Sequence, residues 1–256
     1  MKVNKKIFLF LGAPGSGKTT YSQTLNGFLL SLGKKSVYVN LDCSNNFLSN
    51  CNSIDFREIM FGEEILSELH IGPNCSVFFS IEYLIENIEW LESKMEILNT
   101  KNQIEYFLFD VPGQMELFTH NKALKKMVKK FKQNQFSFST LILSDSFFWY
   151  DKTNYHILAL SNLMMIFNTE TAFFHILTKT DLVKNFTQNE KKKREENSKK
   201  IQNFNQNIFS WGNKLKFSIE DFIYDFGFTY PLSIDLFENS HLLNLIKKLE
   251  KLDYKI

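Results

Sequence analysis

The chain has 256 residues, of which 44% are hydrophobic, and a formal net charge of +2. This length and composition favour one compact domain, 1–256, and the 27 phenylalanines indicate aromatic packing in its core. A charge so close to zero gives no general attraction to nucleic acid, so direct nucleic-acid binding is not expected. The three cysteines form no C-x-x-C pair, which argues against a disulfide framework or a zinc site and favours a reducing compartment.

The first predicted strand, Lys5 to Leu11, runs into the sequence GAPGSGKTT, which a predicted helix follows. This is the G-x-x-x-x-G-K-[ST] pattern in the strand-to-helix setting that a phosphate-binding loop requires. The glycines let backbone N–H groups face an anion, Lys18 reaches the β and γ phosphates, and the hydroxyl of Thr19 binds Mg²⁺. A glycine turn that matches by chance is the alternative, and the flanking elements disfavour it. The expected phosphate-binding residues are Gly12, Pro14, Gly15, Ser16, Gly17, Lys18, Thr19 and Thr20.

A second strand is predicted at Ser36 to Leu41. Apolar residues then recur at helical spacing from Ile81 to Leu98, which predicts a stripe that faces the core or a second subunit. A third strand, Glu105 to Asp110, is predicted to end in an acidic residue. Because ligands lie at the carboxyl ends of parallel strands, the carboxylate of Asp110 is expected beside the metal ion.

The sequence DVPGQ follows directly after this third strand. Gly113 allows the backbone to approach the γ phosphate closely, and Gln114 can orient an attacking water molecule. Glu116 is near enough in the sequence to join the same polar network. An ordinary D-x-P-G turn is the alternative interpretation, and the phosphate-binding loop upstream makes the catalytic one more probable.

Two further strands are predicted at Ser139 to Ser144 and Phe173 to Leu177, and the sequence TKTD follows the second. The carboxylate of Asp181 can accept two hydrogen bonds from guanine, while the stem of Lys179 lies across the ring. The usual guanine signature has Asn where this chain has Thr178, so the match is partial. A helix start capped by threonine and aspartate is the alternative.

A last short strand is predicted at Phe228 to Tyr230, and the backbone of Leu232 and Ser233 is expected to border the guanine, unless this segment is a strand-ending turn. Strands that alternate with helices predict an α/β fold with a mainly parallel sheet flanked by helices on both faces, the P-loop NTPase arrangement. The charged run around 184–206 is expected to be a variable, solvated insert.

Taken together, these motifs resemble those of the GPN-loop GTPase family. The likeness covers the chain to about Val183, and it is nearest to eukaryotic type 2 members, followed by type 3. Departures occur at Cys43 and Ser44, where the family has Pro-Ala, and at Cys75 and Ser76, where it has Gly-Gly. The motifs that carry the resemblance are GAPGSGKTT, VNLD, DFRE, the triplet Gly72, Pro73 and Asn74, IEYLIENIEWL, FLFDVPGQMELFTH and TKTDL.

The resemblance implies a SIMIBI-type fold and a dimer, homomeric or with a paralogue, whose GPN loops cross the interface. It implies that Asn74 acts on the partner subunit's phosphates and that Asp42 helps to place the Mg²⁺ shell or the hydrolytic water. Without the resemblance, Gly-Pro-Asn would be interpreted as a simple turn. The implied metal set is Thr19, Asp42 and Asp110, and the implied catalytic set is Asp42, Asn74, Asp110, Gln114 and Glu116.

The implied function is Mg²⁺-dependent GTP hydrolysis in the assembly and nuclear import of RNA polymerase II, with polymerase subunits or assembly factors as partners. The protein is then expected in the cytoplasm, with shuttling to the nucleus, and away from membranes. One alternative is a nucleotide-switched assembly chaperone with negligible turnover. Another is a P-loop kinase, which the presence of only two arginines, Arg57 and Arg194, disfavours. Arg57 would be a finger in cis or part of a structural ion pair.

Overall fold

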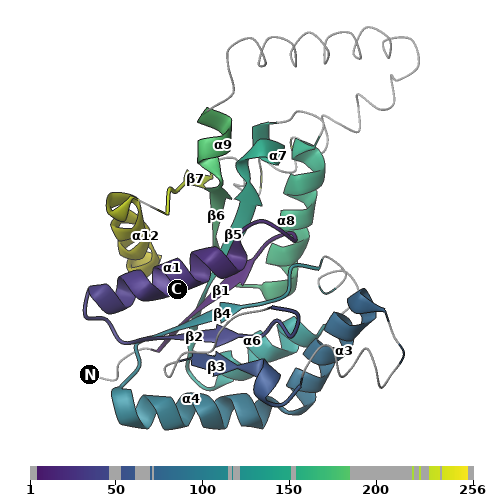
Figure 1. Ribbon diagram of the computed structural model, residues 1–256, viewed down its shortest axis with the longest axis vertical. Coiled ribbons are helices and arrows are strands. Elements are labelled where there is room, and N and C mark those ends of the chain that lie inside the picture. Colours follow the sequence, from purple (N-terminus) through teal and green to yellow (C-terminus); the bar gives the residue numbers. More distant parts are fainter. Residues whose placement is uncertain are drawn as a thin grey trace, which may run out of the picture.

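The structure, a computed structural model, describes residues 5–45, 53–60, 70, 72–114, 117, 122–150, 154–184, 221, 225, 231–236 and 238–252 (Figure 1). Within these residues seven strands form one sheet in the order β3-β2-β4-β1-β5-β6-β7, and all paired strands are parallel. The predicted α/β fold with a parallel sheet is confirmed. The strands are β1 (Lys6–Leu11), β2 (Ser36–Asn40), β3 (Ser53–Asp55), β4 (Tyr106–Asp110), β5 (Ser137–Asp145), β6 (Ala172–Thr178) and β7 (Leu232–Ser233).

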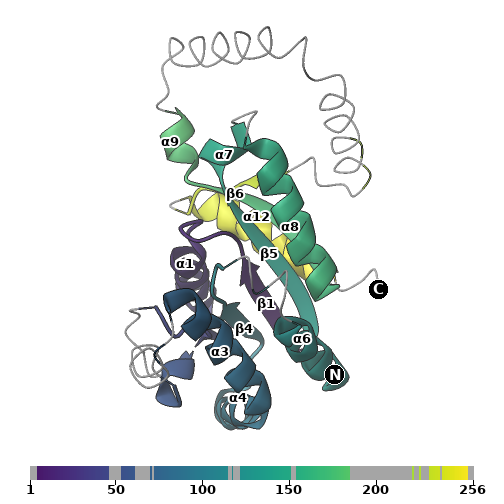
Figure 2. The same cartoon turned by 90° about the vertical axis from the view of Figure 1, so that its right-hand side faces the viewer.

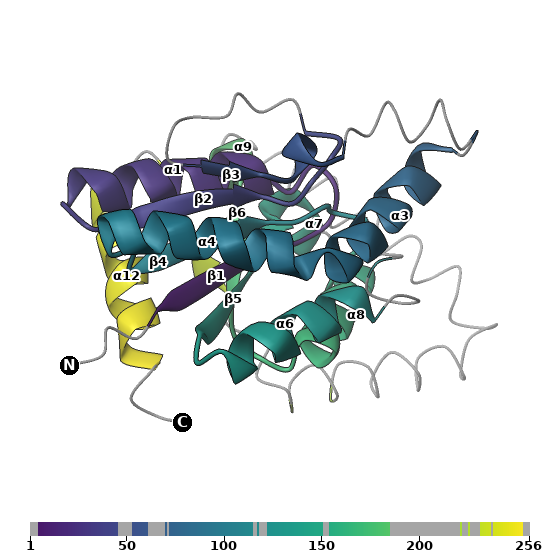
Figure 3. The ribbon, with the colours of Figure 1, turned by 90° about the horizontal axis from the view of Figure 1, so that it is seen from below.

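Helices lie on both sides of the strands (Figures 2 and 3). This arrangement is required because a parallel sheet exposes two apolar faces, and each face needs a covering layer. None of the helices in the described part of the chain has the length and apolar character that crossing a bilayer would demand. The described helices are α1 (Lys18–Ser31), the 3-10 helix η1 (Phe56–Glu58), α3 (Pro73–Glu86), α4 (Ile88–Asn102), α6 (Ala123–Gln133), α7 (Ser146–Tyr150), α8 (Tyr155–Thr169), α9 (Thr180–Lys184) and α12 (Asn239–Leu252).

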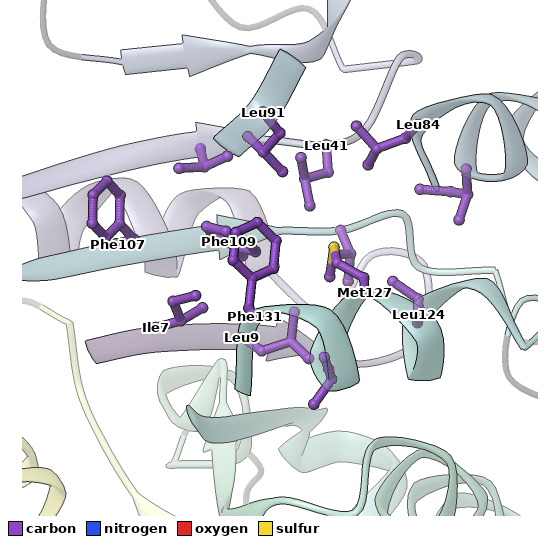
Figure 4. Close-up of a cluster of buried hydrophobic side chains, with 14 of the residues drawn as sticks. Ile7, Leu9, Leu41, Leu84, Leu91, Phe107, Phe109, Leu124, Met127 and Phe131 are labelled. Carbon is purple, nitrogen blue, oxygen red and sulfur yellow. The ribbon is translucent and has the colours of Figure 1, made fainter. Parts of the chain in front are cut away.

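The central strand β1 is buried on both faces, and its alternate residues belong to two different hydrophobic clusters. Ile7 and Leu9 pack with Phe109 of β4 and with residues of α3, α4 and α6 (Figure 4). Phe8 and Phe10 pack on the other face with residues of α1 and α12. The aromatic residues therefore fill the core, as the composition predicted.

Three expectations about the elements need correction or restriction. The strand β3, which has three residues and pairs with β2, was not predicted from the sequence. The predicted stripe from Ile81 to Leu98 faces the core, but it is divided between α3 and α4, because Asn87 ends one helix and begins the next. The strand predicted at 228–230 lies outside the described residues, as does most of the charged run at 184–206.

Candidate nucleotide-binding site

The predicted site residues gather at one edge of the sheet. All paired strands run in the same direction, so the segments that follow β1, β2, β4 and β6 leave from their carboxyl ends. In parallel sheets this edge is where ligands bind. The loop after β1 lies between those after β4 and β5, which are the neighbours of β1 in the sheet.

The loop between β1 and α1 has the backbone that glycine favours. Gly12, Gly15 and Gly17 have φ values of 149°, 74° and 90°. At Gly12 an added Cβ would lie 2.3 Å from the carbonyl oxygen of Leu143, so no other residue fits without movement of β5. Pro14 and Ser16 lie inside the loop, and Thr20 lies in the first turn of α1. The conformation is thus fixed by local sequence and by contact with the neighbouring strand.

Lys18 lies folded back over this loop, with only 7% of its surface exposed. Its Nζ donates to the carbonyl oxygens of Gly12 and Ala13, both at 3.1 Å. Burial lowers the pKa of Lys18, while the charges of Asp110 and Asp42 oppose this change. The loop after β4 lies directly against it, since a Cβ on Gly113 would be 2.4 Å from Nζ. The ammonium group therefore lies between the phosphate loop and the segment that follows β4.

Two acidic side chains lie beside Lys18. Asp110, 1% exposed, accepts a hydrogen bond at its Oδ2 from the hydroxyl of Tyr38 at 2.8 Å. Its Oδ1 is buried and has no hydrogen-bond partner among the described residues. Asp42 accepts from the backbone N–H of Ser44 at 2.9 Å. Burial raises the pKa of both carboxyl groups. Hydrogen bonds from Thr19 and Tyr38 to Asp110 and from the Ser44 N–H to Asp42 oppose this effect, and the charge of Lys18 opposes it further at each.

These groups fit a magnesium ion. Thr19 and Asp110 offer hydroxyl and carboxylate oxygens, the hard ligands that Mg²⁺ prefers, and Oδ1 of Asp110 is a buried acceptor that needs a partner. In the described part of the chain, no group of three or more His, Cys, Asp or Glu side chains could hold a metal without help. This suits Mg²⁺, which commonly keeps several waters and binds substrate phosphates as well as one or two carboxylates.

The Gly-Pro-Asn segment forms the start of a helix and is not a free-standing turn. Gly72 is the N-cap of α3, Pro73 is its first residue, and the carbonyl of Gly72 accepts from Ser76 N at 3.0 Å. Asn74 is exposed, and its Oδ1 accepts from Nε2 of Gln114 in the same chain at 3.4 Å. The structure thus brings together two of the predicted catalytic residues. Glu116, the predicted catalytic residue that follows Gln114, lies outside the described residues.

The residues predicted to bind the base lie around the end of β6, the region called the base edge below. The hydroxyl of Thr178 donates to the carbonyl oxygens of Ser16 and Ser144, at 2.8 and 3.2 Å. Thr178, which replaces the usual asparagine, therefore connects this edge to the phosphate loop. Lys179 has a positive φ of 54° and contacts Asp145 with its Nζ at 2.9 Å. Asp181 is exposed in the first turn of α9.

The two remaining base-site candidates belong to the edge strand of the sheet. Leu232 and Ser233 make up β7 and pair with Ile176 and Leu177 of β6. Ser233 is exposed and pairs with Leu177, which is two residues before Lys179. Their backbone thus runs next to the strand that carries the predicted guanine residues.

Several residues of the site were not predicted from the sequence, or their role was left open. Tyr38 and Asn45 contact the proposed metal ligands from β2 and the segment after it. Of the two roles considered for Arg57, the structure has the ion pair, with Asp55 at 2.5 Å. Cys43, a departure from the family pattern, is buried and donates to the hydroxyl of Ser80 at 3.3 Å.

The sheet is parallel, a glycine loop that bears a lysine follows its central strand β1, and an acidic residue ends the neighbouring strand β4. These features define the fold of a P-loop nucleotide-binding protein. A family described as "Conserved hypothetical ATP binding protein" has a model that matches residues 10–254. GPN-loop GTPase 3 of Eremothecium gossypii is 30% identical, over 89% of this chain and 84% of its own. The chain belongs to the GPN-loop GTPase family, as its motifs predicted.

Two further comparisons agree with this assignment. GPN-loop GTPase 2 of Danio rerio is 34% identical over 69% of this chain. The chain spans about half the length of such type 2 relatives, 55% for this one. The solved structure of a GTPase in apo form from Pyrococcus abyssi is 30% identical, with a TM-score of 0.57 that covers 74% of this chain and 72% of that one. Members of both predicted types thus appear among the relatives.

Proposed function

We propose that the protein binds GTP with Mg²⁺ and hydrolyses it to GDP and phosphate at the carboxyl edge of the sheet. The observation that carries the proposal is the burial of Lys18 between the glycine loop and the segment after β4, next to Asp42 and Asp110. A bound triphosphate would take over the two hydrogen bonds that Lys18 now gives to loop carbonyls. Relatives named GTPases support the choice of reaction.

Thr19, Asp42 and Asp110 would hold the magnesium ion, which neutralises phosphate charge when bound. Gln114 would orient the water that attacks the γ phosphate. Its amide is directed by Asn74, because Nε2 donates to Oδ1 of that residue. The other end of the amide, Oε1, is then the acceptor for a water proton. Glu116 belongs to the same proposal on sequence grounds alone.

The proposed base is guanine, read by Lys179 and Asp181 and bordered by Leu232 and Ser233. The matching family is described as ATP binding, whereas the named relatives are GTPases, so the base has to be tested directly. An exposed carboxylate at the start of α9 supports guanine, because it can accept two hydrogen bonds from the N1 and N2 groups, which adenine does not offer.

The proposal also includes a dimer in which Asn74 acts on a partner subunit. It further includes RNA polymerase II clients and movement of the protein from the cytoplasm to the nucleus. Their support is the family resemblance. In the single chain Asn74 already lies near Gln114, so a second subunit would add to this contact or replace it.

A single-turnover assay of phosphate release tests the reaction. We expect release from GTP by the unmodified protein and a rate about 100-fold lower for Gln114→Leu, comparable to the loss of other positioned polar groups. The matched control is Gln133→Leu, an exposed change at the far end of α6, which should retain the rate. Equal, near-zero rates for all three would favour the switch with negligible turnover. Labelled γ phosphate on an added hydroxyl acceptor would favour a kinase.

A further inference from the structure

Asn45 lies against two of the groups assigned to the metal. Its Nδ2 donates to Oγ1 of Thr19 at 3.1 Å and to Oδ2 of Asp110 at 3.5 Å. An amide nitrogen is a donor with partial positive charge and has no lone pair for a metal. Thr19 belongs to α1, Asp110 ends β4, and Asn45 comes from the segment after β2. Three separate parts of the chain therefore meet through this one amide.

The Asn45 amide and a magnesium ion compete for the hydroxyl oxygen of Thr19. A magnesium ion binds its ligands at about 2.0–2.1 Å, with lone pairs directed at the metal. The lone pairs of Thr19 Oγ1 that face the Asn45 amide cannot also face a cation. The two carboxylate oxygens of Asp110 differ. Tyr38 and Asn45 both donate to Oδ2, while Oδ1 has no hydrogen-bond partner among the described residues. The carboxylate can thus accept a cation at one oxygen, and Thr19 is the ligand that Asn45 withholds.

A polar chain through the neighbouring strands keeps Asn45 in place. Arg57 donates from Nη1 to the carbonyl oxygen of Asn45 at 2.9 Å and pairs with Asp55 through Nη2. Asp55 in turn accepts from Asn40 Nδ2 at 3.1 Å. Asn40 Oδ1 accepts from the backbone N–H of Asp42 at 3.2 Å. The segment from Asp42 to Asn45 is therefore held at both ends by side chains of β2, β3 and η1.

We propose that Asn45 is a placeholder for the cation. In the nucleotide-free protein its amide satisfies Thr19 and Asp110, and binding of Mg²⁺ displaces it. Because Asp42 lies in the same segment, displacement of Asn45 changes the position of a further proposed ligand. Because Arg57 contacts the carbonyl of Asn45, the displacement also loosens the contact with η1. This inference rests on the proposed function, since it takes Thr19 and Asp110 as metal ligands.

The test is a titration of GDP-bound protein with Mn²⁺, a paramagnetic substitute for Mg²⁺, with the free ion followed by electron paramagnetic resonance. The phosphate oxygens of GDP supply the ligands that the side chains alone do not. Asn45→Ala removes the competing donor, and we expect Mn²⁺ to bind about 2- to 10-fold more tightly, the value of one ordinary hydrogen bond. Ser44→Ala is the matched control, because it changes the adjacent exposed residue, and it should bind as the unmodified protein does. Unchanged or weaker binding by Asn45→Ala would overturn the proposal.

A second variant tests the proposal independently of whether Asn45→Ala folds. Arg57→Lys keeps the positive charge beside Asp55 but loses the hydrogen bond from Nη1 to the Asn45 carbonyl, so it should also tighten Mn²⁺ binding, by a smaller factor. Combined with Asn45→Ala it should add nothing, because both changes act through the same amide. Additive effects, or weaker binding by Arg57→Lys, would contradict the placeholder.

The titration reads metal binding and not turnover, so its outcome is separate from that of the hydrolysis assay. Phosphate release with no tightening in Asn45→Ala overturns the inference alone. Failure of all the proteins to bind Mn²⁺ overturns the metal site and the inference together.

Discussion

The phosphate edge and the base edge of the proposed site are built differently. At the phosphate edge, Ser16, Lys18 and Asp110 are all buried, and the loop between β1 and α1 has a backbone that glycine fits best. At the base edge, Lys179 and Asp181 are exposed side chains at the start of a helix of five residues. Recognition of a triphosphate requires charges that are placed before the ligand arrives. A base is distinguished by a few hydrogen bonds that exposed groups can supply.

The base edge nevertheless has a fixed backbone. Lys179 adopts a left-handed φ of 54°, which is uncommon for a residue with a side chain. Its carbonyl accepts a hydrogen bond from the hydroxyl of Ser146 at 2.9 Å, and its ammonium pairs with Asp145. The difference between the two edges therefore concerns the side chains. Variants at the phosphate edge should affect the reaction, and variants at the base edge should affect the choice of nucleotide.

The largest effect is expected for Lys18→Ala, which breaks the phosphate edge. Phosphate release from GTP should fall by about 100-fold or more, because a charged group that faces the transferred phosphate is lost. Thermal stability of the nucleotide-free protein should change little. Burial disfavours the charged ammonium, and its removal relieves this cost, while two hydrogen bonds to loop carbonyls and the attraction to Asp110 and Asp42 are lost. Lys126→Ala, an exposed change on α6, is the control for both measurements. A large loss of stability in Lys18→Ala would mean that this lysine is structural.

Asp181→Asn should sharpen the comparison at the base edge. The carboxylate that accepts two hydrogen bonds becomes an amide with one acceptor, so the ratio of GTP to ATP affinity should fall by about 10- to 100-fold. Since Asp181 is exposed, stability should change by less than about 0.5 kcal/mol. Calorimetric titration with each nucleotide measures the ratio, and Glu96→Gln on the exposed face of α4 is the control. Parallel changes for GTP and ATP would disprove guanine recognition by this residue.

Thr178→Val tests the connection between the two edges. It removes the hydroxyl that donates to Ser16 and Ser144 and leaves buried carbonyls with fewer donors, which should cost about 1–3 kcal/mol of unfolding free energy. Thr24→Val is the matched control, because the hydroxyl of Thr24 donates to Thr20 at an exposed position. Urea denaturation compares the two. Equal losses would show that the connection contributes nothing specific.

The smallest effect concerns pH and a buried histidine of β6. Burial lowers the pKa of His175 to about 3, so the folded state keeps it neutral while the unfolded state gains a proton below its ordinary value of 6.5. Stability from this residue is therefore complete above 6.5 and is lost as the pH falls toward 3. Between about pH 7 and about pH 5.5 the loss should be about 1 kcal/mol. His175→Gln should remove this part of the pH dependence, whereas the exposed His70→Gln should retain it. An unchanged slope in His175→Gln would refute the linkage.

The phosphate loop could be predicted from the sequence because its conformation depends on local spacing. Gly12, Gly15 and Gly17 determine the turn wherever a strand precedes and a helix follows. The strands that carry Asp110 and Thr178 were predicted for a similar reason, since long apolar runs with few breaks are typical of parallel strands buried on both faces. Each of these features depends on a sequence stretch of about ten residues, so no long-range contact is needed to predict it.

The polar contacts around the loop could not be predicted, because they depend on strand register. Tyr38 reaches Asp110 across 72 positions of sequence, and Asn40 meets Asp55 through the pairing of β2 with β3. The strand β3 has only three residues and lacks an apolar run, so neither its existence nor its register was detectable. Thr178 appeared to be a weakened guanine signature, and only the position of β5 beside β1 and β6 reveals its bonds to Ser144 and Ser16.

The burial of β1 on both faces has a consequence for how the protein unfolds. Ile7 and Leu9 belong to one apolar layer, and Phe8 and Phe10 belong to the other, so neither layer can melt without exposing the strand they share. Loss of either layer also releases Gly12 from its close approach to Leu143, since the turn continues directly from this strand. We therefore expect the geometry of the glycine turn to be lost in the same transition as the core.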